Sequence, residues 1–149
     1  MSYTDVKVIS ASKYFKFEAN IPRDLRILDL TPVETFKHQA KKGQVLCTGV
    51  TDGCQWCLEG DIPRQRLLTN VYDYESQRVL IWEFGKNVMK ALQAIEKTLN
   101  TSTKITDVDL RVEATGDGFD RKYTVTPLIN SKTPPANIKL HKLGADLPF

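Results

Sequence analysis

The sequence of 149 residues lacks a long apolar run. A helix that crosses a bilayer needs about 20 predominantly apolar residues in succession, and no segment of this chain comes near that length. The first residues, 1–7, also lack the charged and then apolar order of a secretory signal. We therefore expect no contact with a membrane and a cytoplasmic location.

Cysteine is scarce, and its count of three is odd. A disulfide framework needs paired cysteines and an oxidising compartment. In a reducing compartment, clustered cysteines are more often metal ligands. The three cysteines therefore point to a metal site rather than to disulfide bonds.

A recognisable catalytic constellation is also missing. Zinc deaminases place a glutamate two residues after the ligand that opens the site, but the residue two after His38 is Ala40. A two-metal nuclease needs clustered carboxylates. Asp107, Asp109 and Glu113 share one face of a predicted strand, where a solvated surface is the simpler interpretation. We therefore predict that the protein is not an enzyme.

Short alternating segments and one amphipathic helix make up most of the chain. Residues 86–99 are predicted as the helix, because Val88, Leu92, Ile95 and Leu99 recur at helical spacing with lysines on the other side. Alternation and β-prone composition predict the strands. The strand segments are 14–17, 24–30, 35–38, 66–74, 78–84, 107–113 and 121–127.

The predicted order is strands, an irregular loop, a hairpin, the helix and a second hairpin. About five strands with one helix between the third and the fourth favour a mainly β OB-fold, a five-stranded Greek-key barrel, although other α+β sandwiches share this order. Residues 1–129 would form this single domain. Residues 130–149 carry Pro134-Pro135 and basic side chains without a core pattern, so we expect a flexible C-terminal tail.

Residues 41–63 break the periodic pattern and contain all three cysteines. Cys54 and Cys57 form a Cys-x-x-Cys pair, and His38 with Cys47 would complete a tetrahedral set that is typical of structural zinc. Such a loop, about residues 38–62, has little apolar surface to bury, and metal binding would order it. Four protein ligands leave no open position for a substrate, so we predict one structural Zn²⁺.

Other interpretations of these residues stay open. The Cys54–Cys57 pair could be a redox motif, although the parallel sheet that usually holds one is not predicted here. The cysteines could also be ordinary buried residues. His141, in the tail, could replace His38 as the fourth ligand.

Basic and aromatic residues interleave in the predicted barrel strands. The net charge of +3 permits nucleic-acid binding without requiring it. Single strands are bound by a basic groove with aromatic rings on which bases stack. Trp82 shares a strand face with Leu80 and Phe84, so burial fits its position as well as stacking does. The candidate contacts are Lys37, Arg64, Arg66, Trp82, Arg111, Phe119, Arg121, Lys122 and Tyr123.

The ordered set of these motifs resembles the zinc-containing single-stranded-DNA-binding proteins of tailed phages, which include the helix-destabilising replication proteins of T-even phages. The resemblance covers about residues 14–128. The segments that carry it are His38…Cys47…Cys54-x-x-Cys57, Pro63-Arg64-Gln65-Arg66, Val79 to Lys86, and Gly116 to Val125.

This resemblance implies an OB-fold with an inserted zinc subdomain that binds single strands without sequence preference during replication, recombination or repair, in a host cytoplasm. It implies that Arg64 and Arg66 lie in the basic segment after the metal loop, and that Trp82 can stack on a base. The basic N-terminal arm of the T-even proteins has no match here, so we expect a monomer or a weak oligomer. By position, the implied zinc ligands are His38, Cys47, Cys54 and Cys57.

The last four residues, Asp146-Leu147-Pro148-Phe149, resemble the C-terminal tip of bacterial single-stranded-DNA-binding proteins, which docks on replication and repair partners. An apolar anchor with a terminal carboxylate suits a pocket with a basic rim. A zinc-ribbon adaptor or regulator that acts on RNA or on a protein partner is the alternative, because contacts to the 2′-hydroxyl cannot be identified from sequence.

Overall fold

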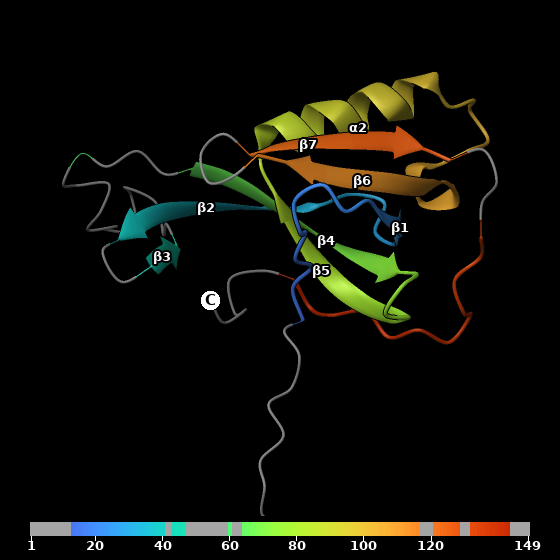
Figure 1. Ribbon diagram of the computed structural model, residues 1–149, viewed down its shortest axis with the longest axis horizontal. Helices are drawn as coiled ribbons and strands as arrows, with labels where there is room; N and C mark the ends of the chain where they lie inside the picture. The colour runs from blue at the N-terminus through green and yellow to red at the C-terminus, as the bar shows by residue number, and fades with distance from the viewer. Residues whose placement is uncertain are drawn as a thin grey trace, which may run out of the picture.

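The computed structural model describes residues 13–40, 43–46, 60, 64–116, 121–128 and 132–143. In these residues seven antiparallel strands form one sheet, accompanied by one α-helix (Figure 1). The protein is therefore mainly β, and its arrangement is consistent with an OB-like fold. The elements are β1 (Arg23–Ile27), β2 (Val33–Ala40), β3 (Gly43–Leu46), β4 (Arg64–Asp73), β5 (Arg78–Phe84), α2 (Lys86–Thr98), the 3-10 helix η2 (Ile105–Asp107), β6 (Asp109–Thr115) and β7 (Lys122–Pro127).

Strand β4 is the centre of the sheet because it pairs with three other strands. Its first half pairs with β2, from Lys37 opposite Arg64 onward, and its second half pairs with β1. Its other edge pairs with β5. The sheet continues from β1 to β6 and from β6 to β7. In Figure 1, α2 lies along β7 at the top of the view, while β4 and β5 lie below.

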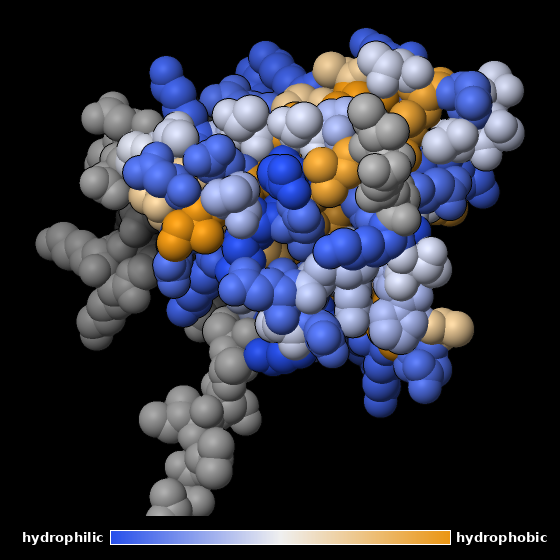
Figure 2. Space-filling model, turned by 45° about the vertical axis from the view of Figure 1, so that its right-hand side comes forward, coloured by the Kyte–Doolittle hydropathy of each residue, from blue (hydrophilic) through white to orange (hydrophobic). Residues whose placement is uncertain are grey.

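The hydrophobic core lies between the sheet and α2. The helix contributes Val88, Leu92 and Ile95, which confirms the helical spacing predicted from the sequence. Burial of such a side chain stabilises the fold by about 1.5–3 kcal/mol. With 13 residues, α2 is too short to cross a bilayer, and no other helix in the described part of the chain could do so. Figure 2 shows mostly hydrophilic side chains on one face, with the apolar ones chiefly in its upper half.

Two predictions of strands need correction. Residues 14–17 form no strand: Tyr14 makes an isolated bridge to Ile81, and the rings of Phe15 and Phe17 enter the core, stacked 4.3 Å apart. Conversely, β3 lies inside the loop predicted to be irregular, where residues 43–46 pair antiparallel with the end of β2. With β1 and β2 as two separate strands, the sheet exceeds the predicted five.

The described part of the tail, residues 132–143, lies against the sheet without forming a helix or a strand. At one end the backbone N–H of Lys132 donates to the Asp109 carboxylate. At the other end the Asn70 side chain pairs with the backbone of His141, accepting from its N–H at 2.9 Å and donating to its carbonyl at 3.1 Å. The sequence predicts a flexible tail, but these polar contacts to distant buried residues fix this part of it.

Replacing Asn70 by alanine should loosen the tail. The change removes both hydrogen bonds between the Asn70 side chain and the backbone of His141, and it leaves the N–H and carbonyl of His141 without these partners. The free energy of unfolding, measured by urea titration, should therefore fall by about 1–3 kcal/mol. Trypsin should cut after Lys139 and Lys142 faster than in the unchanged protein. Gln65→Ala, on the exposed end of the same strand, is the matched control. Equal cleavage rates in both variants would show that Asn70 does not hold the tail.

Candidate nucleic-acid interface

A groove of about 630 Å³ lies where the start of β4, the end of β5, the start of α2 and the start of β7 meet. Among the described residues, its lining contains one carboxylate, that of Glu83. Gly85, Asn87 and Tyr123 also line the groove. The groove is therefore cationic, and its cations are Arg64, Arg66, Lys86, Arg121 and Lys122.

The register of the sheet brings these charges together from distant parts of the sequence. Leu67 pairs with Phe84, so the start of β4 lies beside the end of β5 and the helix that follows it. Arg64 and Arg66 are two residues apart and lie on one face of β4, as the alternation predicts. Strand β7 begins at Lys122 and supplies the opposite wall.

Glu83 forms ion pairs with two cations at the base of the groove, Lys37 and Arg66. Its Oε1 accepts from the Nζ of Lys37, which is 4% exposed, and its Oε2 accepts from the Nε of Arg66 at 3.4 Å. A buried ammonium is costly unless a carboxylate neutralises it. Lys37 is therefore part of the supporting network, whereas the sequence analysis predicts a contact with nucleic acid.

Gly85 allows Arg66 to lie against the start of α2. A Cβ atom added at Gly85 would lie 2.8 Å from the Nη1 of Arg66, so only glycine leaves this space without displacing the guanidinium. The first turn of α2 has no acidic residue and no side-chain cap. Its free N–H groups and the helix dipole therefore add to the positive potential of the groove.

On the opposite wall Arg121 is held beside an aromatic ring. Its Nη2 donates to the carbonyl of Phe17, and its guanidinium carbon lies 5.9 Å from the ring centre of Tyr123. The Tyr123 ring also contacts the edge of Phe17, with centres 5.6 Å apart, and remains 37% exposed. This arrangement presents one face of a fixed ring next to a cation, which suits the stacking of a nucleobase.

Trp82 does not lie in this groove. It is 2% exposed, and its ring packs on Phe17 and Phe84 in the core, with centres 5.8 and 5.0 Å away. The ring has no free face on which a base could stack, so the prediction of stacking at Trp82 is wrong for this structure. Alternation in β5 correctly places Trp82 with Leu80 and Phe84 on one face, and that face is the core.

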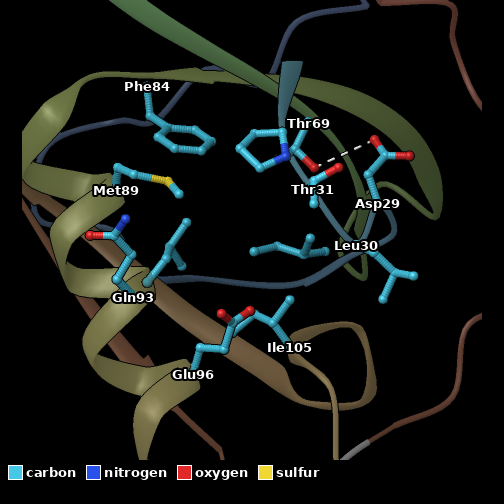
Figure 3. A pocket seen from close by; sticks show the side chains of 12 residues that line it. Asp29, Leu30, Thr31, Thr69, Phe84, Met89, Gln93, Glu96 and Ile105 are labelled. Atoms are coloured by element: carbon cyan, nitrogen blue, oxygen red, sulfur yellow. Dashed lines mark hydrogen bonds between the residues drawn. The ribbon is translucent and has the colours of Figure 1, made fainter. Parts of the chain in front are cut away.

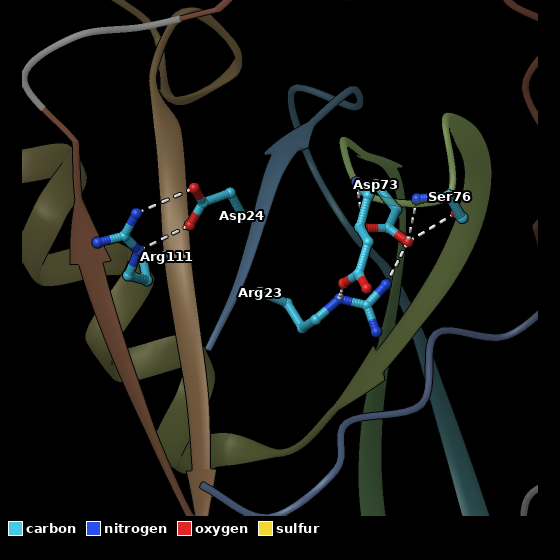
Figure 4. Close-up of polar contacts among 6 residues, drawn as sticks. Arg23, Asp24, Asp73, Ser76 and Arg111 are labelled. Atoms are coloured by element: carbon cyan, nitrogen blue, oxygen red, sulfur yellow. Dashed lines mark hydrogen bonds and ion pairs between the residues drawn. The ribbon is translucent and has the colours of Figure 1, made fainter. Parts of the chain in front are cut away.

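Arg111 also lies elsewhere. On the exposed surface of β6 it makes two hydrogen bonds to Asp24 of β1, at 2.8 and 3.1 Å (Figure 4). These bonds from the guanidinium lower the pKa of the Asp24 carboxyl, and the same pairing raises the pKa of Arg111. Arg111 is therefore engaged in the fold, outside the groove. Phe119, another predicted contact, lies outside the described residues.

The structure adds two groove positions that the sequence analysis did not propose, and it shows one exposed ring outside the groove. Gly85 and Lys86 begin the helix inside the groove, and a Gly-Lys pair directly after a strong strand was a signal that could have been used. Phe36 is 43% exposed on β2, opposite Gln65 of β4. No sequence signal distinguishes this exposed ring from the core aromatics.

The predicted zinc ligands cannot be placed in the same way. Cys47, Cys54 and Cys57 lie outside the described residues. His38 lies on β2 with its backbone opposite Val45, but its side chain is not among those described. The zinc site therefore stays a prediction, and so does the partner-docking role of residues 146–149.

Comparison with known proteins gives one informative similarity. No model of a known protein family matches the sequence, and no solved structure gives a significant match. The chain is 32% identical over 63 residues to a protein of Escherichia phage T5 named "Probable ssDNA-binding protein". The match covers 42% of this chain and 24% of the phage protein, so it spans about a quarter of that relative. The chain is thus similar to part of a phage protein named for binding single-stranded DNA.

Replacing Lys37 by methionine tests the network beneath the groove. Loss of one partner of a buried ion pair costs about 3–5 kcal/mol, and we expect the lower end of this range because Arg66 still faces Glu83. Replacing Lys37 and Glu83 together by methionine should restore part of the lost stability, since no buried charge is then left unpaired. Urea unfolding of the two single variants and the double variant measures the coupling. Strictly additive effects would contradict this network.

Proposed function

We propose that the protein binds single-stranded DNA without sequence preference through the basic groove. The observation that carries this proposal is the meeting of five cations, the start of α2 and a half-exposed tyrosine ring in one groove. Phosphates are bound by such cations and by helix N-termini, while bases stack on rings. The similarity to part of a phage protein named for single-stranded-DNA binding supports the same function.

The groove cations divide into positioned and available ones. Arg66 is held by Glu83, and Arg121 by the carbonyl of Phe17. Within the described residues, no ion pair is found for Arg64, Lys86 and Lys122, the three cations free to meet phosphates. Elsewhere the arginines of β1 and β6 are paired with carboxylates and have structural roles, as in Figure 4.

One exposed ring inside the groove, that of Tyr123, supplies the proposed stacking surface. Phe36 pairs with Gln65, so its side chain lies on the opposite face of β4 from Arg64 and Arg66, and it is not among the groove residues. Stacking contributes about 1–3 kcal/mol per base and tolerates any sequence. A strand bound in the groove would be recognised by its phosphates and by a stacked base, so we expect no sequence preference.

We further propose one structural Zn²⁺ on His38, Cys47, Cys54 and Cys57. The β2–β3 hairpin supports this set, because His38 pairs with Val45, which precedes Cys47 by two residues in the sequence. When bound, the ion would order the loop between β3 and β4 without opening a catalytic position. Such a closed site would take no part in catalysis, and we propose that the protein acts by binding and is not an enzyme.

The Greek-key topology, the cellular role and the docking by the C-terminal residues are proposed from the resemblance to the phage proteins. If β1 and β2 count as one interrupted strand, the order with β4, β5, α2, β6 and β7 agrees with a Greek-key OB barrel. The proposed roles are in replication, recombination or repair of phage DNA in the host cytoplasm, as in the T-even proteins. Asp146 to Phe149 would dock a replication or repair protein.

A titration with labelled oligo-dT tests the proposed function. Anisotropy should show tighter binding to the single strand than to a matched duplex, with affinity falling as salt rises. Arg64→Ala should weaken binding and reduce the log-log salt slope by about 0.7, the value for one phosphate contact. Lys97→Ala, an exposed cation in the last turn of α2, should change neither quantity.

Two outcomes of this titration would overturn the proposal. One is equal binding of duplex and single strand, and the other is the same effect from Arg64→Ala and Lys97→Ala. Tighter binding of a matched RNA oligonucleotide than of oligo-dT would favour the adaptor that acts on RNA.

Metal analysis tests the zinc proposal separately. The purified protein should contain about one zinc per chain, as one closed four-ligand site requires. Cys54→Ser should lose the metal and destabilise the loop, which proteolysis between residues 47 and 63 would detect. Ser76→Ala, a change in the β4–β5 turn, controls for general handling. Full metal content in Cys54→Ser would exclude this ligand set.

A further inference from the structure

A second hollow lies between α2 and the loop that joins β1 to β2, and it is apolar where the basic groove is charged (Figure 3). Its volume is about 130 Å³. The ring of Phe84, which also lines the basic groove, forms part of one wall. The other apolar walls come from Ile27, Pro32, Met89, Leu92 and Ile105.

The size of the hollow suits one large side chain. An apolar cavity of about 150 Å³ stays dry and takes up benzene, so a hollow of about 130 Å³ accepts a leucine, an isoleucine or a phenyl ring. It is open at the surface, where Leu30 is 58% exposed and extends the apolar area. In Figure 3 the Leu30 side chain points away from the hollow, so it is available to a docked molecule.

The rim of the hollow is acidic. Asp29 and Glu96 lie on different sides of it, and its lining contains no cation within the described part of the chain (Figure 3). Asp29 is fixed, because its Oδ2 accepts from the backbone N–H of Asn70 at 2.7 Å and from the Asn70 amide at 3.0 Å. Its Oδ1 takes part in neither bond. Glu96 is exposed on α2 and its carboxylate is turned toward the hollow.

This charge decides between the possible occupants. Phosphates of a nucleic acid are repelled by two carboxylates. The C-terminal tip of the chain is equally unsuited, because Asp146 and the terminal carboxylate are negative. An occupant with an apolar side chain next to a positive charge satisfies both the walls and the rim.

We propose that this hollow docks a segment of a partner protein that inserts one leucine, isoleucine or phenylalanine and carries lysine or arginine beside it. The site lies on the other side of Phe84 and the first turn of α2 from the basic groove, so a bound single strand and the partner can be held together. The inference goes beyond DNA binding and does not depend on it.

Binding of a short labelled peptide tests this docking site. The probe has a central leucine flanked by lysine and arginine, and two matched peptides replace the leucine by serine or the cations by glutamate. Because the chain itself has a net charge of +3, its overall charge does not attract the basic probe. Anisotropy should show saturable binding of the first peptide alone, with NMR shifts centred on Met89, Leu92 and Ile105.

Three substitutions on α2 locate the site. Gln93→Phe fills the mouth of the hollow, and Glu96→Lys leaves a rim with one negative and one positive charge, so each should weaken peptide binding by about tenfold or more, as for the central contacts of an interface. Ala94→Phe, exposed on the same helix outside the hollow, should leave peptide binding unchanged. Oligo-dT affinity, measured on the same samples, should not change in any of the three.

The results separate this inference from the proposed function. Equal losses of peptide binding in Gln93→Phe and Ala94→Phe, or equal binding of the glutamate peptide, would overturn the docking site even if oligo-dT binds normally. Shifts of Met89 and Leu92 that appear on concentrating the protein alone would show a second copy as the occupant and would also overturn it. A failure of oligo-dT binding alone would affect only the DNA proposal.

Discussion

Strand β4 carries apolar side chains on both faces and unpaired backbone groups along both edges unless other elements cover them. The rest of the molecule is arranged so that both faces are covered and both edges are paired. Leu67 and Val71 point into the core, while Leu68 on the opposite face packs with Ile81 in a separate cluster. Because both edges are paired, β1, β2 and β5 are fixed relative to one another. The second face needs a cover, and the tail provides it where the Asn70 amide pairs with the backbone of His141 like a neighbouring strand.

The position of a cation along β4 also decides whether it is paired with a carboxylate or is available to a ligand. Toward its end, Asp73 is fully buried and paired with Arg23, and beside it the β1–β6 ladder holds its arginines in ion pairs (Figure 4). At its start, Arg64 extends past the core into solvent, where the described residues offer it no carboxylate. The arginines within the sheet are thus neutralised by carboxylates, whereas the cations available for a ligand lie at the start of β4, beyond the core.

Hydrophobic periodicity and composition predicted most of the helices and strands. They did not predict which face of a strand lies in the core or which distant segments touch. The helix follows from spacing alone, because its apolar residues face a single core. The β4–β5 hairpin follows from its two β-prone segments and the turn between them, although its apolar residues divide between two clusters. Alternation could not tell whether the face of Trp82 is the core or a binding surface, and the structure shows the core. The tail was missed because Asn70 and Asp109, which hold it, contact it across long sequence separations. Lys86 was missed because its place in the groove depends on the register of β4 against β5.

Helix α2 gives the two proposed sites opposite preferences through one dipole. Its N-terminus, without an acidic first turn, opens into the cationic groove and favours anions by about 0.3–1 kcal/mol. Nearer its C-terminus, where the dipole is negative, Glu96 and Asp29 face the apolar hollow, which favours a cationic partner. Phe84 contributes to the wall of both sites, so they lie close together in the fold. A phosphate chain and a basic peptide can therefore bind the same small domain without competing for the same charge.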